Sequence, residues 1–213
     1  MASRRYARRA VVAGLVMLGA LPFAVASCSS APSPTPDISL NPANAPRDER
    51  ITLPETVGLA LRHPVPKDRT EHQVLYTVQQ SVRSLLHAEY GPGTGDPLLS
   101  AYWSGSALTT VRHDVTTWAK LHEQPVGVLV ISAMTYQAPG AGGEATVSYC
   151  ANWQHVDRGN ATTHVVGAAV QQPGTAGTYT TLTLAKSAAQ PGFGSHWKVT
   201  GLAEAPNSPR CKN

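Results

Sequence analysis

The amino-acid sequence predicts an α+β domain in which N-terminal helices pack in a curved antiparallel sheet. Apolar residues recur at helical spacing between residues 70 and 122, whereas β-branched residues and apolar–polar alternation dominate from Val126 onward. Turns rich in glycine and proline separate the strand-like stretches at hairpin length, which favours an antiparallel meander. We expect this domain to span residues 68–213, after a cleaved signal peptide at residues 1–27 and a partly disordered, proline-rich tether at residues 28–67.

The N-terminal segment has the three parts of an export signal. Four arginines precede an acid-free apolar stretch at residues 10–26, and small residues follow before Cys28. The apolar stretch is shorter than the roughly 20 residues that a membrane-spanning helix needs, so we expect cleavage. The opening "SRRYA" resembles the start of a twin-arginine signal, but four arginines also suit the general secretory route, and both routes stay open.

Two cleavage patterns overlap at the end of this signal. Val25-Ala26-Ser27-Cys28 resembles a bacterial lipobox, whose cysteine is acylated before cleavage in front of it, whereas Ala24-Val25-Ala26 suits the ordinary signal peptidase. We favour lipidation, because the other product keeps Cys28 as an unpaired thiol in an oxidising compartment. Several acyl chains on one cysteine give effectively stable attachment. The expected location is therefore extracytoplasmic, with Cys28 anchored to the outer face of the cell membrane.

The charge balance changes once the signal is removed. The whole chain carries 17 basic and 13 acidic residues, a formal net charge of +4. Residues 1–27 contain four of the basic residues and no acid, so 13 basic residues remain against 13 acidic ones. Because the remaining chain is neutral and has no basic cluster, we expect no nucleic-acid partner.

The segment after Cys28 is rich in residues that oppose compact folding. Eight of the 17 prolines lie between residues 29 and 67. Proline removes backbone donors and fixes φ, so the first part of this segment is expected to stay extended. The apolar piece "ITLPETVGLALRH" is either tether or an ordered arm packed on the domain, so ordered structure is expected to begin between Ile51 and Thr70.

The first helix is predicted over residues 70–90. Thr70 and Gln73 stand in capping-box relation at its start, and Gly91-Pro92-Gly93 ends it. Its apolar face is formed by residues that recur at i, i+4, i+8 and i+11, namely Val74, Val78, Val82 and Leu85.

Two further helices are predicted before the sheet. Asp96 caps a short helix that begins at Pro97 and runs through Tyr102. A third helix is expected from about Ser106, and Pro125 is expected to stop it. The apolar face of this third helix lines up Leu108, Val111, Val115, Trp118 and His122.

Strands are predicted throughout the rest of the chain. Five strand-like stretches follow one another: "VGVLVISAMTYQ", "EATVSYCANW", "ATTHVVGAAVQQ", "TYTTLTLAKS" and "SHWKVTGLAEA". "EATVSYCANW" alternates most cleanly, and its predicted apolar face carries Ala145, Val147, Tyr149, Ala151 and Trp153.

Two cysteines remain once Cys28 is lipidated. Cys150 lies in a predicted strand and Cys211 in the C-terminal tail, with no CxxC or HxxxH neighbour. We therefore expect a structural disulfide rather than a metal site. No metal and no cofactor are expected, since the eight histidines are scattered without ligand spacing.

The order of three helices, then "ATVSYC", then "HWKVTGLAEAPNSPRC" resembles actinobacterial lipoproteins with a nuclear transport factor 2-like domain. The resemblance implies that a curved sheet wraps around the helices to form a cone over residues 70–213. Tyr149 stands where the family pattern has an acid; this departure leaves the implied fold intact but puts acid-dependent chemistry at that position in doubt. Most such lipoproteins have no assigned activity. The matching positions are Ala145-Thr146-Val147, Cys150, Trp197, Val199 and Cys211.

Enzymes with this kind of cone, such as ketosteroid isomerases, polyketide cyclases and dehydratases, need a carboxylate or His whose pKa is tuned by an apolar pocket. On the predicted third helix, Asp114 flanks the apolar stripe and His122 falls inside it. A solvated Asp114 and a helix-end His122 are the simpler interpretation, because spacing places no second polar partner. No catalytic residue is predicted, and the candidate pocket lining is Trp103, Asp114, Trp118 and His122.

Three functions fit these observations. The favoured one is a non-catalytic cell-envelope lipoprotein whose domain binds or scaffolds a protein partner or an apolar ligand. The second is a pocket enzyme that acts on a lipid-like small molecule, and the third is an accessory subunit of an envelope transport or secretion assembly. A deep pocket with a buried acid would favour the enzyme, whereas a filled cone with an exposed apolar patch would favour the other two.

Overall fold

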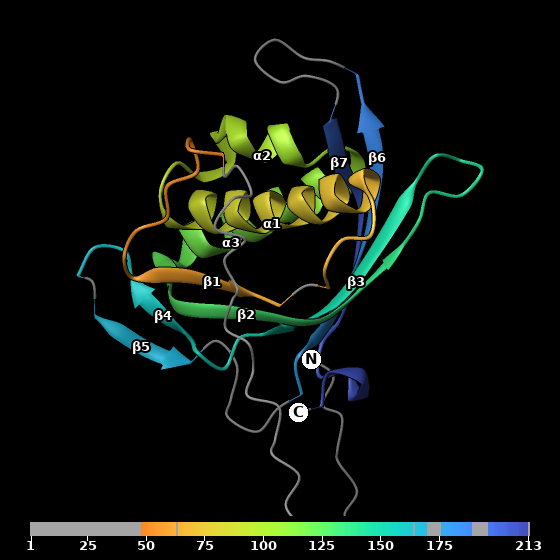
Figure 1. Ribbon diagram of the computed structural model, residues 1–213. Helices are drawn as coiled ribbons and strands as arrows, with labels where there is room; N and C mark the ends of the chain where they lie inside the picture. Colours follow the sequence, from red (N-terminus) through yellow and green to blue (C-terminus); the bar gives the residue numbers. More distant parts are fainter. Residues whose placement is uncertain (1–47, 63, 164, 170–175, 189–195, 213) are drawn as a thin grey trace, which may run out of the picture. The chain divides into compact units, whose positions relative to one another are not determined.

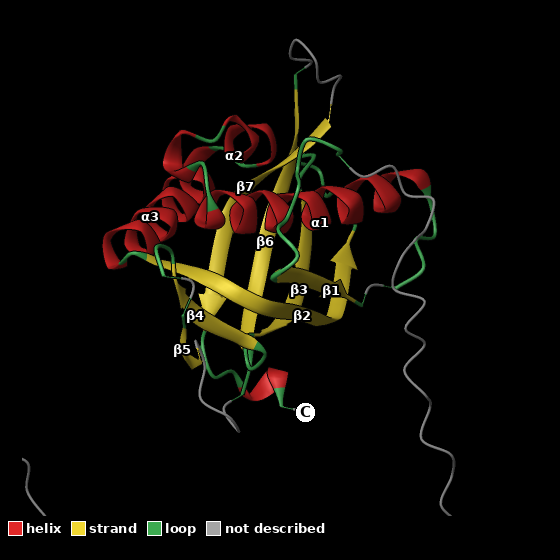
Figure 2. Ribbon diagram, turned by 90° about the vertical axis from the view of Figure 1, so that its left-hand side faces the viewer, coloured by secondary structure: helices red, strands yellow, loops and turns green. Residues whose placement is uncertain are grey.

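The computed structural model describes residues 48–212, apart from residues 63, 164, 170–175 and 189–195 (Figure 1). The expected signal peptide, Cys28 and the first part of the expected tether lie outside the described residues. Figure 2 shows three helices on one face of a curled, mostly antiparallel sheet, which confirms the predicted α+β class. The elements are β1 (Val57–Leu61), α1 (Arg69–Tyr90), α2 (Pro97–Tyr102), α3 (Gly105–Leu121), β2 (Glu123–Gln137), β3 (Ala145–Asn152), β4 (Val156–Asn160), β5 (Val166–Ala169), β6 (Thr178–Ser187) and β7 (His196–Ala205), with short 3-10 turns at Gly93–Gly95 and Pro209–Cys211.

Helix α1 begins at a different cap from the predicted one. The Glu71 N–H donates to Asp68 Oδ1 at 2.8 Å, and Glu71 Oε2 accepts from the Lys67 N–H at 2.8 Å. The capping pair is therefore Asp68 and Glu71, and the prediction of Thr70 and Gln73 is wrong. Asp68 has the extended backbone of a residue just outside a helix, with φ −147°, whereas Thr70 already lies in the first turn.

Replacing Asp68 with alanine is expected to lower the free energy of unfolding by about 1 kcal/mol, because the Glu71 N–H loses its acceptor. Thr70→Ala is the matched control and is expected to change that free energy much less. Urea denaturation of the two variants beside the unaltered protein measures the difference. Equal losses in both variants would show that Asp68 is not the cap that matters.

The end of α1 and the start of α2 are joined through Asp96. Its Oδ1 accepts from the Leu98 N–H at 2.9 Å, which confirms the predicted cap, and its Oδ2 lies 2.8 Å from His87 Nδ1. Trp103 follows α2 and is buried, with its Nε1 donating to the Ser81 carbonyl oxygen at 3.0 Å. The short helix is thereby fastened to α1 at both of its ends.

Helix α3 ends at Leu121, before the residue predicted to stop it. His122 adopts a left-handed conformation with φ 52° and caps the last turn through its N–H. Pro125 instead lies inside β2, opposite Arg158 of β4. Proline has no N–H to donate to a neighbouring strand. It is tolerated at this position because β1 pairs with β2 only from Gly127 onward, so no described strand lies beside Pro125 on the β1 side of β2. In the described part of the chain, no helix is long and apolar enough to cross a membrane.

The sheet has the order β5–β4–β2–β3–β6–β7, and β1 pairs in parallel with β2. Strands β2, β3, β6 and β7 form the predicted antiparallel run, but β4 returns to pair with the first half of β2. The predicted simple meander is therefore wrong in its middle. Gly127 permits this pairing: its φ is +118° and a Cβ there would collide with the His155 carbonyl oxygen, so only glycine lets the chain before β4 come so close.

The ordered domain starts before residue 68. Of the two interpretations of "ITLPETVGLALRH", the ordered arm is confirmed, because part of this segment forms strand β1 of the sheet. Strand β1 pairs with β2 from Val57 opposite Gly127 to Leu61 opposite Ile131. Ile51, which precedes β1, is only 2 % exposed. Ile51, Val57 and Leu61 of the arm are buried in the core, so the arm contributes apolar surface to it.

Polar contacts fasten the start of the described chain to the helices. Asp48 Oδ2 accepts from the Tyr102 hydroxyl at 2.6 Å and lies 2.7 Å from Arg50 Nη2. The hydrogen bond from Arg50, opposed in part by burial, holds the pKa of Asp48 at about 2, well below its usual range. Arg83 Nη2 on α1 donates to the Ile51 carbonyl oxygen at 2.6 Å. The arm is thus tied to both α1 and α2.

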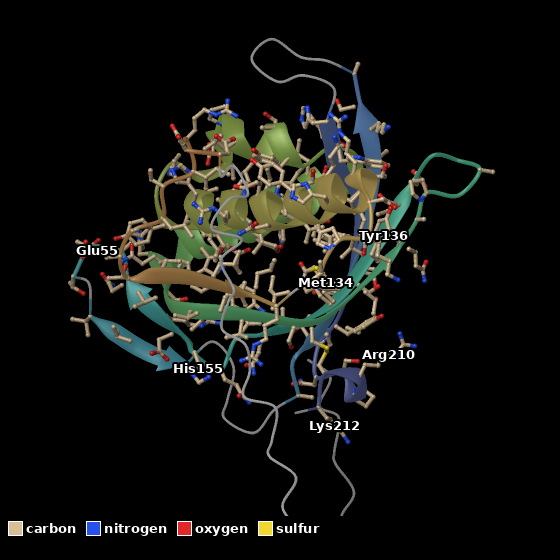
Figure 3. All side chains as sticks on the ribbon, viewed as in Figure 1. Glu55, Met134, Tyr136, His155, Arg210 and Lys212 are labelled. Atoms are coloured by element: carbon tan, nitrogen blue, oxygen red, sulfur yellow. A yellow bond between two sulfur atoms is a disulfide. The ribbon has the colours of Figure 1, made fainter. Side chains whose placement is uncertain are left out.

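The C-terminal tail is joined to the sheet. The Sγ atoms of Cys150 on β3 and Cys211 lie 2.06 Å apart, at disulfide distance, and their Cα atoms lie 5.4 Å apart. Figure 3 shows this sulfur–sulfur bond close to the labelled Arg210. The Ser208 N–H also donates to the Gly177 carbonyl oxygen at 3.0 Å, so the tail closes the end of the sheet where β6 begins.

Candidate functional site

A small cavity of about 40 Å³ lies between the helices and the sheet. Most of its wall is aliphatic and comes from α1, β2, β3 and β7. A cavity of this size holds about three water-sized groups. Its polar and aromatic lining residues are Trp103, Asp114, Tyr149, Trp153, Thr180 and Glu204.

One row of the sheet supplies the polar floor of the cavity. Tyr149 on β3 lies opposite Thr180 on β6, and Thr180 lies opposite Glu204 on β7. Two residues further along each strand, the equivalent row is apolar and consists of Val147, Leu182 and Leu202. The inner face therefore changes from apolar to polar at one end of the sheet.

A β-bulge turns Glu204 toward this floor. Thr183 pairs with Gly201, but the next residue of β6, Leu184, pairs with Val199, so β7 contains one extra residue at Thr200. Side chains alternate between faces along a strand, so the extra residue shifts the alternation by one. Glu204 consequently shares the inner face with buried Val199.

The helices bring two more carboxyl groups to the same end. Asp114 on α3 is half-buried and lines the cavity. Glu89 on α1 follows cavity-lining Leu85 by four residues, so it lies on the same helical face one turn on. The Glu89 side chain is buried, and its Oε2 has no hydrogen-bond partner among the described residues.

The pKa of each of these three carboxyl groups is raised, mainly by burial. Burial, reinforced by repulsion from Asp114 and Glu204, raises the pKa of Glu89 to about 8. Burial also raises the pKa of Asp114, against the opposing effect of neighbouring His113. The pKa of Glu204 is raised by partial burial and by Asp114, although Glu204 reaches solvent at the rim. At neutral pH, Glu89 is therefore mostly protonated.

Tyr149 and Thr180 complete the polar lining. Burial, with a smaller contribution from Glu204, raises the pKa of the Tyr149 hydroxyl, so this group stays a neutral donor and acceptor at physiological pH. Thr180 is 1 % exposed, and its hydroxyl interacts with that of Tyr149. Tyr149 and Thr180 therefore add hydroxyl groups to a lining that is otherwise mostly aliphatic.

The arrangement suits a hydrogen-bond donor or a positive group better than a metal ion. Within the described residues, no three His, Cys, Asp or Glu side chains are placed to hold one metal ion. Asp114 and Glu204 line the cavity, whereas Glu89 lies one helical turn beyond cavity-lining Leu85. A small organic group could occupy the cavity beside the first two.

The candidate residues from the sequence divide into two sets. Trp103 and Asp114 line the cavity. Trp118 and His122 do not: the Arg158 guanidinium lies 5.7 Å from the centre of the Trp118 ring, and His122 is exposed beyond the end of α3. The prediction placed His122 on the helical stripe, but the left-handed backbone at this residue takes it off that stripe.

Glu89 and Glu204 were not predicted from the sequence as site residues. Glu89 continues the apolar face of the first predicted helix, so an acid on a buried stripe was a usable signal. Glu204 had no such signal, because only the bulge at Thr200 turns it inward. Tyr149 was assigned to the correct face by simple alternation.

Comparisons with protein-family models, with curated proteins and with solved structures found no match to this chain. The resemblance to nuclear transport factor 2-like lipoproteins therefore stays a proposal.

Proposed function

We propose that this protein is a cell-envelope lipoprotein, anchored through Cys28 at the outer face of the membrane, whose domain binds a small ligand group without catalysing a reaction. We also propose that the domain is a nuclear transport factor 2-like cone. The three helices on a curled sheet are consistent with that shape. Two partners are proposed. The membrane holds the lipid anchor, and the ligand, which is either free or part of another protein, binds the domain.

The observation that carries the binding function is the size and lining of the cavity. Pockets for drug-sized ligands measure about 300–1,000 Å³, whereas this cavity measures about 40 Å³. A lipid-like or polycyclic substrate is too large for it. The lining of carboxyl groups and apolar side chains instead suits the tip of a ligand whose remainder stays outside.

The anchor is tested by replacing Cys28 with alanine. The unaltered protein is expected to enter the detergent phase in a Triton X-114 partition, and the Cys28→Ala variant is expected to move to the aqueous phase, because the acylated thiol is lost. Ser29→Ala, one residue beyond the lipobox cysteine, is the matched control and should partition like the unaltered protein. Detergent-phase partition of Cys28→Ala would contradict the anchor.

A second candidate function is acid–base chemistry in the cavity, and the different ionisation of its carboxyl groups favours it. A buried acid with a pKa of about 8 next to a more exposed carboxylate is the kind of pair that general acid–base catalysis uses. We rank it second because the small volume leaves no room for a substrate beside both groups.

A further inference from the structure

We propose that the connection between β1 and α1 binds the surface of an anionic membrane, with Val65 entering the lipid interface and basic side chains contacting the headgroups. This inference goes beyond ligand binding in the cavity and rests on the proposed location of the domain at the outer face of the cell membrane. Figure 1 shows the connection leading from the end of β1 to the start of α1. Residues 64–67 of this connection are called the tip.

The tip presents one apolar side chain to solvent. Val65 is 86 % exposed, more than any other large apolar side chain in the described part of the chain. Pro64 and Pro66 flank it, and a residue before proline is restricted to extended backbone, so few conformations are open to Val65. Neither proline has an N–H that would lose its water in lipid. Entry into the lipid interface therefore costs little conformational freedom and few hydrogen bonds.

Exposed cations flank Val65 on both sides in the sequence. Arg62 precedes it, Lys67 and Arg69 follow it, and all three are exposed. Within the described residues, none of the three forms a salt bridge with an acid. Each is therefore available to a lipid phosphate, and each basic side chain near an anionic surface strengthens binding by about fivefold.

The two acids of this segment are engaged in the start of α1. The carboxylate of Asp68 accepts from the Glu71 N–H, and Glu71 is 5 % exposed and accepts from the Lys67 N–H. On the neighbouring strand β6, Lys186 is exposed and lines the same open cleft as Asp68. Positive side chains therefore outnumber negative ones on this surface, which complements the charge of anionic headgroups.

A membrane fits this surface better than a protein partner. A stable protein interface covers about 800 Å² on each side and centres on well-packed anchors such as Trp or Tyr. The tip offers a single valine with cations near it, which suits lipids because they need no complementary shape.

The length of the expected tether also favours the membrane. Residues 29–47, which are 19 in number, separate Cys28 from the first described residue. A flexible chain of that length would span about 25 Å. An anchored domain would thus stay within reach of the headgroups, which raises the effective concentration of the tip at the membrane.

The test measures co-sedimentation with lipid vesicles of the full chain carrying Cys28→Ala, in which no thiol at residue 28 can be acylated. At low salt, binding is expected to vesicles of equal parts phosphatidylglycerol and phosphatidylcholine, and not to vesicles of phosphatidylcholine alone. Val65→Ser in this background is expected to weaken binding by about tenfold, because the apolar contact is lost. Lys67→Gln is expected to weaken it by about fivefold.

Each variant of the tip has a matched control of the same chemistry. Val165→Ser changes another exposed valine, just before β5, and Lys120→Gln changes an exposed lysine on α3. Both controls should bind like the Cys28→Ala chain. Residues 1–47 apart from residue 28 are unaltered in every chain, so they do not contribute to the differences.

Three outcomes would overturn the proposal. Equal binding to both kinds of vesicle would show that anionic headgroups are not recognised. Weakening by a control as large as that by its tip variant would show that the contact lies elsewhere. Absence of binding to either vesicle would favour a protein as the partner of the tip.

The result is separate from that of the anchor test, because no acyl chain contributes to it. Loss of vesicle binding would leave the detergent partition of the unaltered protein unchanged, and failure of the anchor would not alter the vesicle result. The comparison of the two vesicles uses the unaltered tip, so it stands even if a variant fails to fold.

Discussion

Replacing Glu89 with glutamine is expected to stabilise the protein in mildly alkaline solution and to flatten the dependence of its stability on pH. The pKa of Glu89 is about 8 in the folded protein, and that of an unfolded glutamate is about 4.5. Between these values the unfolded chain has lost this proton while the folded chain still holds it. The free energy of unfolding therefore falls as pH rises from about 4.5 to about 8, and glutamine removes that loss.

The expected size of this effect is a few kcal/mol, since each unit of difference in pKa corresponds to about 1.4 kcal/mol. Urea denaturation at pH 5 and pH 9 measures it. The unaltered protein should lose more stability between the two pH values than Glu89→Gln does, and Asp114 and Glu204 should leave a smaller loss in the variant. Glu144→Gln is the control for removing an exposed carboxylate. An equal loss in Glu89→Gln and the unaltered protein would contradict a buried, protonated Glu89.

Removing the bond between Cys150 and Cys211 is expected to cost about 4 kcal/mol of unfolding free energy. The two residues are 61 positions apart, and a closed loop of that length restricts the unfolded chain strongly. The double variant Cys150→Ser, Cys211→Ser should melt at a lower temperature, and reductant should bring the unaltered protein to a similar melting temperature. Exposure of the tail to protease should increase in both cases.

Reductant applied to the double variant is the control, and it should have no further effect. If reductant left the melting temperature of the unaltered protein unchanged, the bond would be absent or without effect on stability. If the double variant melted far below the reduced protein, the loss would come from serine in the buried position of Cys150 rather than from the missing bond.

The helices could be predicted because each has a repeating face and a recognisable end. Val74, Val78 and Val82 lie on the buried face of α1, and Asp96 with Pro97 starts α2. The cap of α1 was misplaced because Asp68 with Glu71 and Thr70 with Gln73 have the same spacing. Which pair caps the helix depends on where the backbone leaves the extended conformation, and spacing alone does not give that position.

The sheet was predicted in its local alternation but not in its pairing. Tyr149 was placed on the correct face because alternation is a property of one strand. The return of β4 to β2 depends on the bend at Gly127, and the inward turn of Glu204 depends on the bulge at Thr200. Both are properties of two strands together, so Glu204, one of the three carboxyl groups, could not be found from a single strand.

The parallel pairing of β1 with β2 has a consequence for the order of folding. Hairpins such as β6 with β7 join neighbouring segments, but Val57 cannot pair with Gly127 until all three helices between them have emerged. Contacts between distant parts of a chain form slowly, because a long loop must close first. The arm before α1 is therefore expected to join the sheet late in folding. Until it does, the segment around Val57 would stay open to proteases after the hairpins have formed.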